Sequence, residues 1–122
     1  RIYYGASDWY FFDWRKGGLA MATLGKDRWA GYAQQDKKRP AILTTVPLGL
    51  KGKVFVTADI EGSMTVSLID SEGEVIAVSD PVSENCTGHV LSWDREFNAK
   101  KGKGVRLRFK LDRAMIYSFS LK

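Results

Sequence analysis

Two segments near the middle of the chain, Lys53–Ile60 (KVFVTADI) and Met64–Asp70 (MTVSLID), decide the fold class of this sequence. In each, aliphatic residues alternate with polar or aromatic ones, which is the period of a half-buried β-strand. The residues between them, Glu61–Ser63, have the composition of a tight turn. We therefore predict an antiparallel hairpin, continued through a turn at Asp70–Glu74 into a third strand at Val75–Val78.

The last part of the chain repeats this pattern. Val105–Leu111 (VRLRFKL) and Met115–Leu121 (MIYSFSL) alternate in the same way around Asp112–Ala114 (DRA), which predicts a second hairpin. No window of a dozen residues has the period of a capped helix. Shorter strand candidates are Leu19–Leu24, Ile42–Val46 and Val90–Trp93. Eight or nine short strands joined by turns predict an all-β fold, an antiparallel β-sandwich of jelly-roll, lectin-like type.

The length of the chain, 122 residues, predicts a single domain over residues 1–122 with enough surface to bury a core of its own. No apolar run approaches the roughly 20 residues of a membrane span, so we expect no membrane partner. The sequence begins with Arg1 and has no apolar signal region, and we therefore expect a fragment or a processed form of a longer protein.

The net charge of +5 comes from one basic strip. Its members contribute +6 and leave −1 for the remainder of the chain: Lys100, Lys101, Lys103, Arg106, Arg108 and Lys110. Alternation along a strand would put the cations of Arg106–Lys110 on one face, either as a solvated outer face or as an anion-binding surface. Nucleic acid is not an expected partner, because the cations and aromatics are not interleaved on a recognisable scaffold.

Catalytic and metal-binding patterns are lacking in the sequence. A single Cys86 and a single His89 provide neither a disulfide nor a zinc site, and nothing pairs a nucleophile with an oriented base. We therefore expect no enzyme activity and no cofactor. A structural calcium stays open as an alternative, as in other lectin-like sandwiches, but it has no support, since the available carboxylates show no loop-ligand spacing: Asp8, Asp13 and Asp112. Asn85–Thr87 (NCT) has the form of an N-glycosylation acceptor.

Aromatic residues are in surplus near the N-terminus. Asp8–Trp14 (DWYFFDW) would send aromatic side chains to both faces of a strand, and one core can cover only one face. The long segment Gly25–Pro40 adds Trp29 and Tyr32. This segment either packs over the outer aromatics of the first strand or holds its own aromatics beside them as a wall of a site. Two other aromatics, Trp93 and Tyr117, are expected in the core.

Three stretches resemble a known family: YYGASDWYFFDWRKGGLAM (Tyr3–Met21), ILTTVPLGLKGKVFVTADIEGSMTVSLIDSEGEVI (Ile42–Ile76) and GKGVRLRFKLDRAMIYSFSL (Gly102–Leu121). They are similar to C-terminal β-sandwich modules that follow a five-bladed β-propeller related to family 32 and family 43 glycoside hydrolases. In that family the hydrolytic carboxylates belong to the propeller, so the resemblance implies no activity here. Gly17 departs from the family's Asp, and Gly25–Pro40 is longer than the family's loop.

The sequence leads to two functional hypotheses. The first is a non-catalytic module that binds a polysaccharide or oligosaccharide, with Trp29, Tyr32 and Trp9 as a stacking platform and Arg28 and Gln34 as hydrogen-bonding partners. If the basic strip lay near that platform, the ligand would be anionic. The second is a structural accessory domain whose aromatic face docks on a neighbouring catalytic domain of the same chain. Both hypotheses, with the resemblance, imply an extracellular or periplasmic location.

Overall fold

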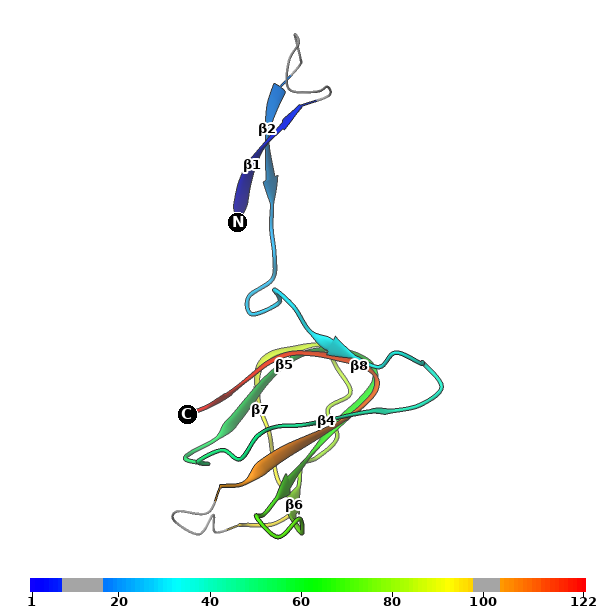
Figure 1. Ribbon diagram of the computed structural model, residues 1–122, viewed down its shortest axis with the longest axis vertical. Coiled ribbons are helices and arrows are strands. Elements are labelled where there is room, and N and C mark those ends of the chain that lie inside the picture. The colour runs from blue at the N-terminus through cyan, green and yellow to red at the C-terminus, as the bar shows by residue number, and fades with distance from the viewer. Residues whose placement is uncertain (8–16, 98–103) are drawn as a thin grey trace.

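The computed structural model describes residues 1–7, 17–97 and 104–122 (Figure 1). The described residues form an all-β structure without a helix, in which every pair of neighbouring strands is antiparallel. The strands are β1 (Ile2–Ser7), β2 (Gly17–Ala22), β3 (Tyr32–Ala33), β4 (Ala41–Thr44), β5 (Val54–Ile69), β6 (Val75–Val78), β7 (Cys86–Val90) and β8 (Arg106–Leu121). This confirms the predicted all-β class.

Two long strands form the centre of the sheet, and both predicted hairpins in their place are wrong. β5 runs for 16 residues through the expected turn at Glu61–Ser63, and β8 runs for 16 residues through the expected turn at Asp112–Ala114. The strands pair with each other along their whole length, from Val54 opposite Leu121 to Ile69 opposite Arg106. Each supposed hairpin is therefore one continuous strand.

The supposed turns are a bend in this strand pair, formed by Ile60–Ser63 of β5 and Asp112–Ala114 of β8. The register shifts between Ile60 and Ser63, and Arg113 has a positive φ of 46°. A Cβ atom on Gly62 would lie 2.4 Å from the carbonyl oxygen of Asp112, so only glycine allows this close approach. A glycine inside an alternating segment marks a bulge as readily as a turn, which is why the pattern was misleading.

The bend folds the strand pair back over itself. Phe109 and Phe119 are ten residues apart on β8, which would separate them by about 33 Å on a straight strand. Their ring centroids are 5.6 Å apart. The buried residues form a single cluster that draws on both halves of both strands, including Val56, Leu68, Leu107 and Ile116. Two sheet layers facing each other across one core are consistent with a β-sandwich.

Four shorter strands extend the two halves of the bent β5–β8 pair. β4 and β3 pair with β8, and β6 and β7 pair with β5. The predicted turn into β6 is confirmed: the Asp70 carboxylate accepts the backbone N–H groups of Glu72 and Glu74 at 2.8 and 2.9 Å, and Gly73 has a φ of 95°. In β8 the cations at 106, 108 and 110 are exposed and alternate with buried Leu107, Phe109 and Leu111, as expected.

The contact between Phe109 and Phe119 provides a test of the bend. In a double-mutant cycle with Phe109→Leu and Phe119→Leu, we expect a coupling of about 0.5–1.5 kcal/mol in the free energy of unfolding, because the two rings touch. The measurement is urea unfolding of the single and double variants. The control cycle, Phe109→Leu with Leu19→Ala, should be additive, since Leu19 is 80% exposed and contributes nothing to the core. Equal couplings in both cycles would contradict the bend.

Candidate functional site

The N-terminal hairpin, β1 and β2, projects away from the rest of the protein (Figure 1). Its two strands pair with each other over six residues each, from Ile2 opposite Ala22 to Ser7 opposite Gly17. One face carries Tyr3, Leu19 and Met21, which are 61%, 80% and 52% exposed. The opposite face carries Ile2 and Tyr4, also exposed. Both faces of this hairpin are therefore apolar and open to solvent.

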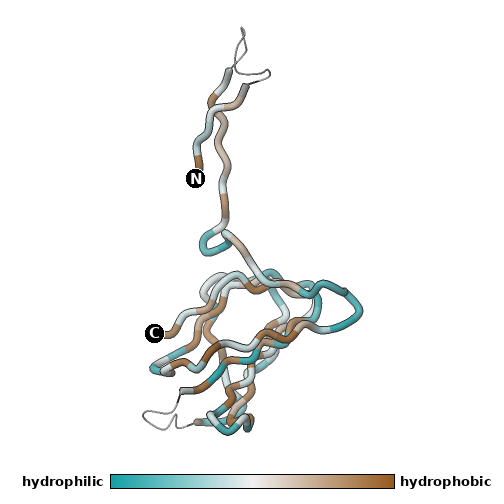
Figure 2. Tube along the Cα trace, in the orientation of Figure 1, coloured by the Kyte–Doolittle hydropathy of each residue, from teal (hydrophilic) through white to brown (hydrophobic). Residues whose placement is uncertain are grey.

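The hairpin also lacks the features that normally protect exposed strands. Neither β1 (IYYGAS) nor β2 (GGLAMA) contains a charged residue or a proline. Figure 2 shows the two strands in pale and brown shades, whereas the loops of the body are strongly hydrophilic. Natural edge strands are usually blunted by charge, proline or a covering segment. Strands that are apolar on both sides are typical of the interior of a larger sheet.

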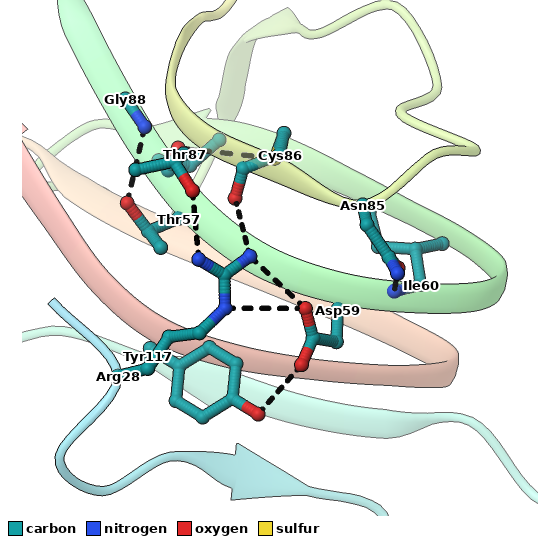
Figure 3. Close-up of polar contacts among 10 residues, drawn as sticks. Arg28, Thr57, Asp59, Ile60, Asn85, Cys86, Thr87, Gly88 and Tyr117 are labelled. Atoms are coloured by element: carbon teal, nitrogen blue, oxygen red, sulfur yellow. Dashed lines mark hydrogen bonds and ion pairs between the residues drawn. The ribbon is translucent and has the colours of Figure 1, made fainter. Parts of the chain in front are cut away.

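A second feature is the Arg28 cluster, made of Arg28, Asp59, Thr87 and Tyr117 (Figure 3). The Arg28 guanidinium donates to Asp59 Oδ1 at 3.0 and 3.3 Å, to Thr87 Oγ1 at 2.7 Å and to the Cys86 carbonyl at 3.3 Å. The Tyr117 hydroxyl donates to the other Asp59 oxygen at 2.8 Å, and Arg28 lies 5.5 Å from the Tyr117 ring centroid. The cluster joins the loop after β2 to β5, β7 and β8.

These contacts change the ionisation of Asp59. The hydrogen bond from Tyr117, then that from Arg28, lowers the pKa of the Asp59 carboxyl below its ordinary value of 3.8. The same hydrogen bond to Asp59 raises the pKa of the Tyr117 hydroxyl above 10.0. The expected core position of Tyr117 is wrong, because its side chain is only partly buried and its hydroxyl reaches this polar cluster.

The residues predicted to form the sugar site differ in how free their side chains are to contact a ligand. Trp29 and Tyr32 are 72% and 69% exposed, so the loop does not bury its own aromatics. Arg28 is committed to protein partners through all three guanidinium nitrogens. The Gln34 side-chain oxygen accepts the backbone N–H of Arg113. Trp9 lies outside the described residues. The structure thus leaves Trp29 and Tyr32 accessible and gives Arg28 and Gln34 roles in the fold.

A pocket of about 390 Å³ lies beside the Arg28 cluster at the bend, and we call it the bend pocket. Four separate segments contribute to its wall. They are the end of β3 with the loop after it, β5 at the bend, the segment before β7, and β8 at the bend. Its lining residues are Ala33, Gln34, Lys37, Asp59, Ile60, Glu61, Asn85, Arg113, Ala114, Met115 and Tyr117.

Cys86 and His89 border another, smaller pocket of about 260 Å³. Gly88, with a φ of 64°, and a register shift in the pairing with β5 interrupt the alternation between them. Burial raises the pKa of the Cys86 thiol above its ordinary value, and the thiol donates to the Val56 carbonyl at 3.8 Å. A protonated, donating thiol is a poor nucleophile, so this pair gives no support to cysteine chemistry.

The part of the chain that the structure describes shows no cluster suited to a metal ion, because no group of three or more His, Cys, Asp or Glu side chains gathers there. Of the carboxylates considered for calcium, Asp112 lies 3.8 Å from the Arg113 guanidinium, while Asp8 and Asp13 fall outside the described residues. None of the described residues belongs to a helix long and apolar enough to cross a membrane.

The basic strip and the platform occupy different halves of β8. The described cations of the strip lie on Arg106–Lys110, which pairs with β4 and the second half of β5. Tyr32 is opposite Ile116, beyond the bend. This arrangement gives no support to an anionic ligand on the platform. The remaining cations, Lys100, Lys101 and Lys103, lie outside the described residues.

Sequence reasoning missed the residues that meet at the bend. Asp59, Glu61 and Asn85 look like ordinary polar residues of a strand and two loops. The one available signal was Asp59, which is the only acidic residue of the segment Lys53–Ile60. Nothing in the sequence shows that Arg28, 31 residues earlier, reaches it.

Comparisons with known proteins found nothing similar. A scan against models of protein families, a search of curated proteins and a search of solved structures each returned no match. The likeness to modules associated with family 32 and family 43 glycoside hydrolases therefore stays a resemblance of motifs.

The lowered pKa of Asp59 predicts a dependence of stability on pH. A carboxyl whose pKa is lower in the folded than in the unfolded state stabilises the fold above the unfolded value. That stabilisation is lost as the pH falls through 3.8 towards the folded pKa. We expect the stability difference between the wild type and Asp59→Asn to shrink from about pH 5 to about pH 2.5, measured by urea unfolding.

The effect should be modest, because the Asp59 side chain is 43% exposed and solvent screens its ion pair. Asp80→Asn, an acid-to-amide change at an exposed site away from the cluster, is the control. A difference between the wild type and Asp59→Asn that stays constant over this range would contradict the coupling of Asp59 to Tyr117 and Arg28.

Proposed function

We propose that this protein is a non-catalytic accessory module that docks through its N-terminal hairpin on a neighbouring domain of the same polypeptide. The observation that carries the proposal is a hairpin that stands apart from the body, is apolar on both faces and has no charged residue in either strand. An isolated two-stranded hairpin is marginally stable in water, so a partner would stabilise it.

The occupant that fits this hairpin is the open edge of an antiparallel sheet. The outer edges of β1 and β2 carry backbone N–H and C=O groups that can extend a sheet by strand addition. Side chains on both faces would then be covered by neighbouring layers, as they are for interior strands. The resemblance to modules that follow a β-propeller suits this partner, because each blade of a propeller is an antiparallel sheet.

The finer features of the proposal follow from the resemblance of motifs to the modules that accompany a β-propeller. In this proposal the body is a β-sandwich of jelly-roll, lectin-like type, hydrolysis belongs to the neighbouring domain, and the protein acts outside the cell or in the periplasm. The absence of an activated nucleophile at Cys86 and His89 supports the non-catalytic role.

Docking predicts that the 122-residue chain by itself associates through the uncovered hairpin. We expect concentration-dependent, polydisperse association in sedimentation velocity, together with enhanced fluorescence of a dye that binds apolar surface. The variant Leu19→Lys/Met21→Lys should abolish both signals, because it places two charges on one face of the hairpin. The matched control is Ile42→Lys/Val46→Lys, two exposed aliphatic residues on the body, which should leave the association unchanged.

Two results would overturn the docking proposal. A monomer at all concentrations without dye binding would mean that the hairpin needs no cover. A stoichiometric dimer that is lost in Leu19→Lys/Met21→Lys would assign the hairpin to a second copy of this chain rather than to a neighbouring domain.

Carbohydrate binding is the second candidate function, favoured by the exposure of Trp29 and Tyr32 on one loop. Flat aromatic faces stack on the C–H side of sugar rings, and indole and phenol rings that face water at 72% and 69% exposure are available for this. The ligand would be a polysaccharide or an oligosaccharide. Trp9 would join this platform only if the hairpin brought it close.

Affinity electrophoresis through a panel of neutral, sulfated and uronate glycans tests this candidate. We expect one glycan to retard the protein and Trp29→Ala to weaken its binding by about tenfold, because a stacking contact is lost. Tyr3→Ala removes another exposed aromatic, on the hairpin, and should leave the retardation unchanged. Retardation by a glycan that Trp29→Ala does not reduce would exclude the platform.

A further inference from the structure

The bend pocket is lined by both apolar and polar side chains, and we infer that it binds a small neutral polyol such as a single sugar residue. This inference goes beyond docking and does not depend on the hairpin. It deepens the second candidate function by assigning carbohydrate a site separate from Trp29 and Tyr32, neither of which lines the pocket.

The size and lining of the pocket suit a small amphipathic ligand. Its volume of about 390 Å³ lies near the lower end of the roughly 300–1,000 Å³ of small-molecule sites. Ile60, Ala114 and Met115 contribute apolar side chains to the lining, which also includes Tyr117. A sugar ring presents C–H groups to such a surface and hydroxyl groups to its surroundings.

The charges of the pocket favour a neutral ligand. Lys37 and Arg113 are balanced by Asp59 and Glu61, so no sign of charge dominates the lining. An anion or a cation would meet repulsion from one pair as well as attraction from the other. Hydroxyl groups both donate and accept hydrogen bonds, and therefore match ammonium, guanidinium and carboxylate groups at the same time.

Several polar groups that line the bend pocket are held in place by hydrogen bonds within the fold. The Asn85 side-chain oxygen accepts the backbone N–H of Ile60 at 2.6 Å, which fixes the amide plane and leaves its NH₂ group as a donor for a ligand (Figure 3). The Asp59 carboxylate is held by Arg28 and Tyr117. Groups that are already oriented lose less entropy on binding, which matters most for a small ligand.

The backbone of Arg113, which lines the bend pocket, gives an independent indication of a binding site. Arg113 has a φ of 46° in the left-handed region, which glycine adopts without cost and arginine does not. It sits at the register shift of the bend, and Gln34 accepts its N–H. Bulges and strained residues concentrate at binding sites, where they direct a side chain. An arginine at a position suited to glycine is explained if its guanidinium is used.

The inference is tested by titrating the 122-residue protein with glucose, galactose, mannose, fructose, xylose and arabinose, followed by isothermal calorimetry and backbone amide NMR shifts. We expect at least one sugar to bind and to shift the amides of residues that line the bend pocket. Glu61→Gln should weaken binding about tenfold, since it removes a charged hydrogen-bond acceptor. The control Glu74→Gln, the same change in the exposed turn before β6, should bind as the wild type does.

Two further variants separate binding from folding. Asn85→Asp keeps the oxygen that accepts the Ile60 N–H but removes the NH₂ donor, so it should weaken binding while keeping the wild-type NMR spectrum outside the pocket. Arg113→Gly relieves the positive φ and removes the guanidinium. It should keep or raise the midpoint of urea unfolding and weaken binding.

Three outcomes would overturn the inference. They are no binding by any of these sugars, binding that Glu61→Gln and Arg113→Gly leave unchanged, or tighter binding of glucuronate or inorganic phosphate than of every neutral sugar. Binding that only Trp29→Ala abolishes would place the sugar on the loop platform instead of the pocket. None of these outcomes bears on the docking proposal, because none of these variants changes a residue of the hairpin.

Discussion

The pairing of β5 with β8 along sixteen residues each is the interaction on which the rest of the structure depends. This strand pair contributes most of the buried core, and four shorter strands attach to its two edges. Because the pair bends at Gly62 and Arg113, its two halves become facing layers, and the buried Phe109 ring contacts the ring of Phe119, which is 36% exposed. A straight pair would have left one face of each half without cover.

The same bend creates the polar surface of the body. The register shift brings Asp59 and Glu61 of β5 next to Arg113 and Tyr117 of β8, and the segments on either side of β3 reach them through Arg28 and Gln34. Arg28 thus fastens a loop that has only two residues of strand, and this leaves Trp29 and Tyr32 on the outside. The contacts that hold this loop and the residues that line the bend pocket therefore lie in the same region.

The docking proposal and the bend-pocket inference depend on two surfaces of different chemical character. The hairpin is uncharged and apolar on both faces, which suits permanent burial in a larger sheet. The bend pocket is polar, balanced in charge and partly organised by the fold, which suits a small exchangeable ligand. An accessory module with both features would stay attached to its neighbour through the hairpin and bind a sugar at the bend pocket of its body.

The sequence by itself determined the all-β class, the turn at Asp70–Glu74 and the burial of Leu107, Phe109 and Leu111, because these follow from alternation and local turn chemistry. Beyond the bend the expected inner face was wrong, since Ala114 and Ile116 are buried there rather than Tyr117 and Phe119. The sequence predicted Trp29 and Tyr32 as site candidates, and both are exposed, but it could not find Asp59, Asn85 and Arg113. Only the tertiary structure decided whether Gly62 and Arg113 reverse the chain or bend it. A glycine in an alternating strand allows both, and the choice depends on pairing with a strand about fifty residues away.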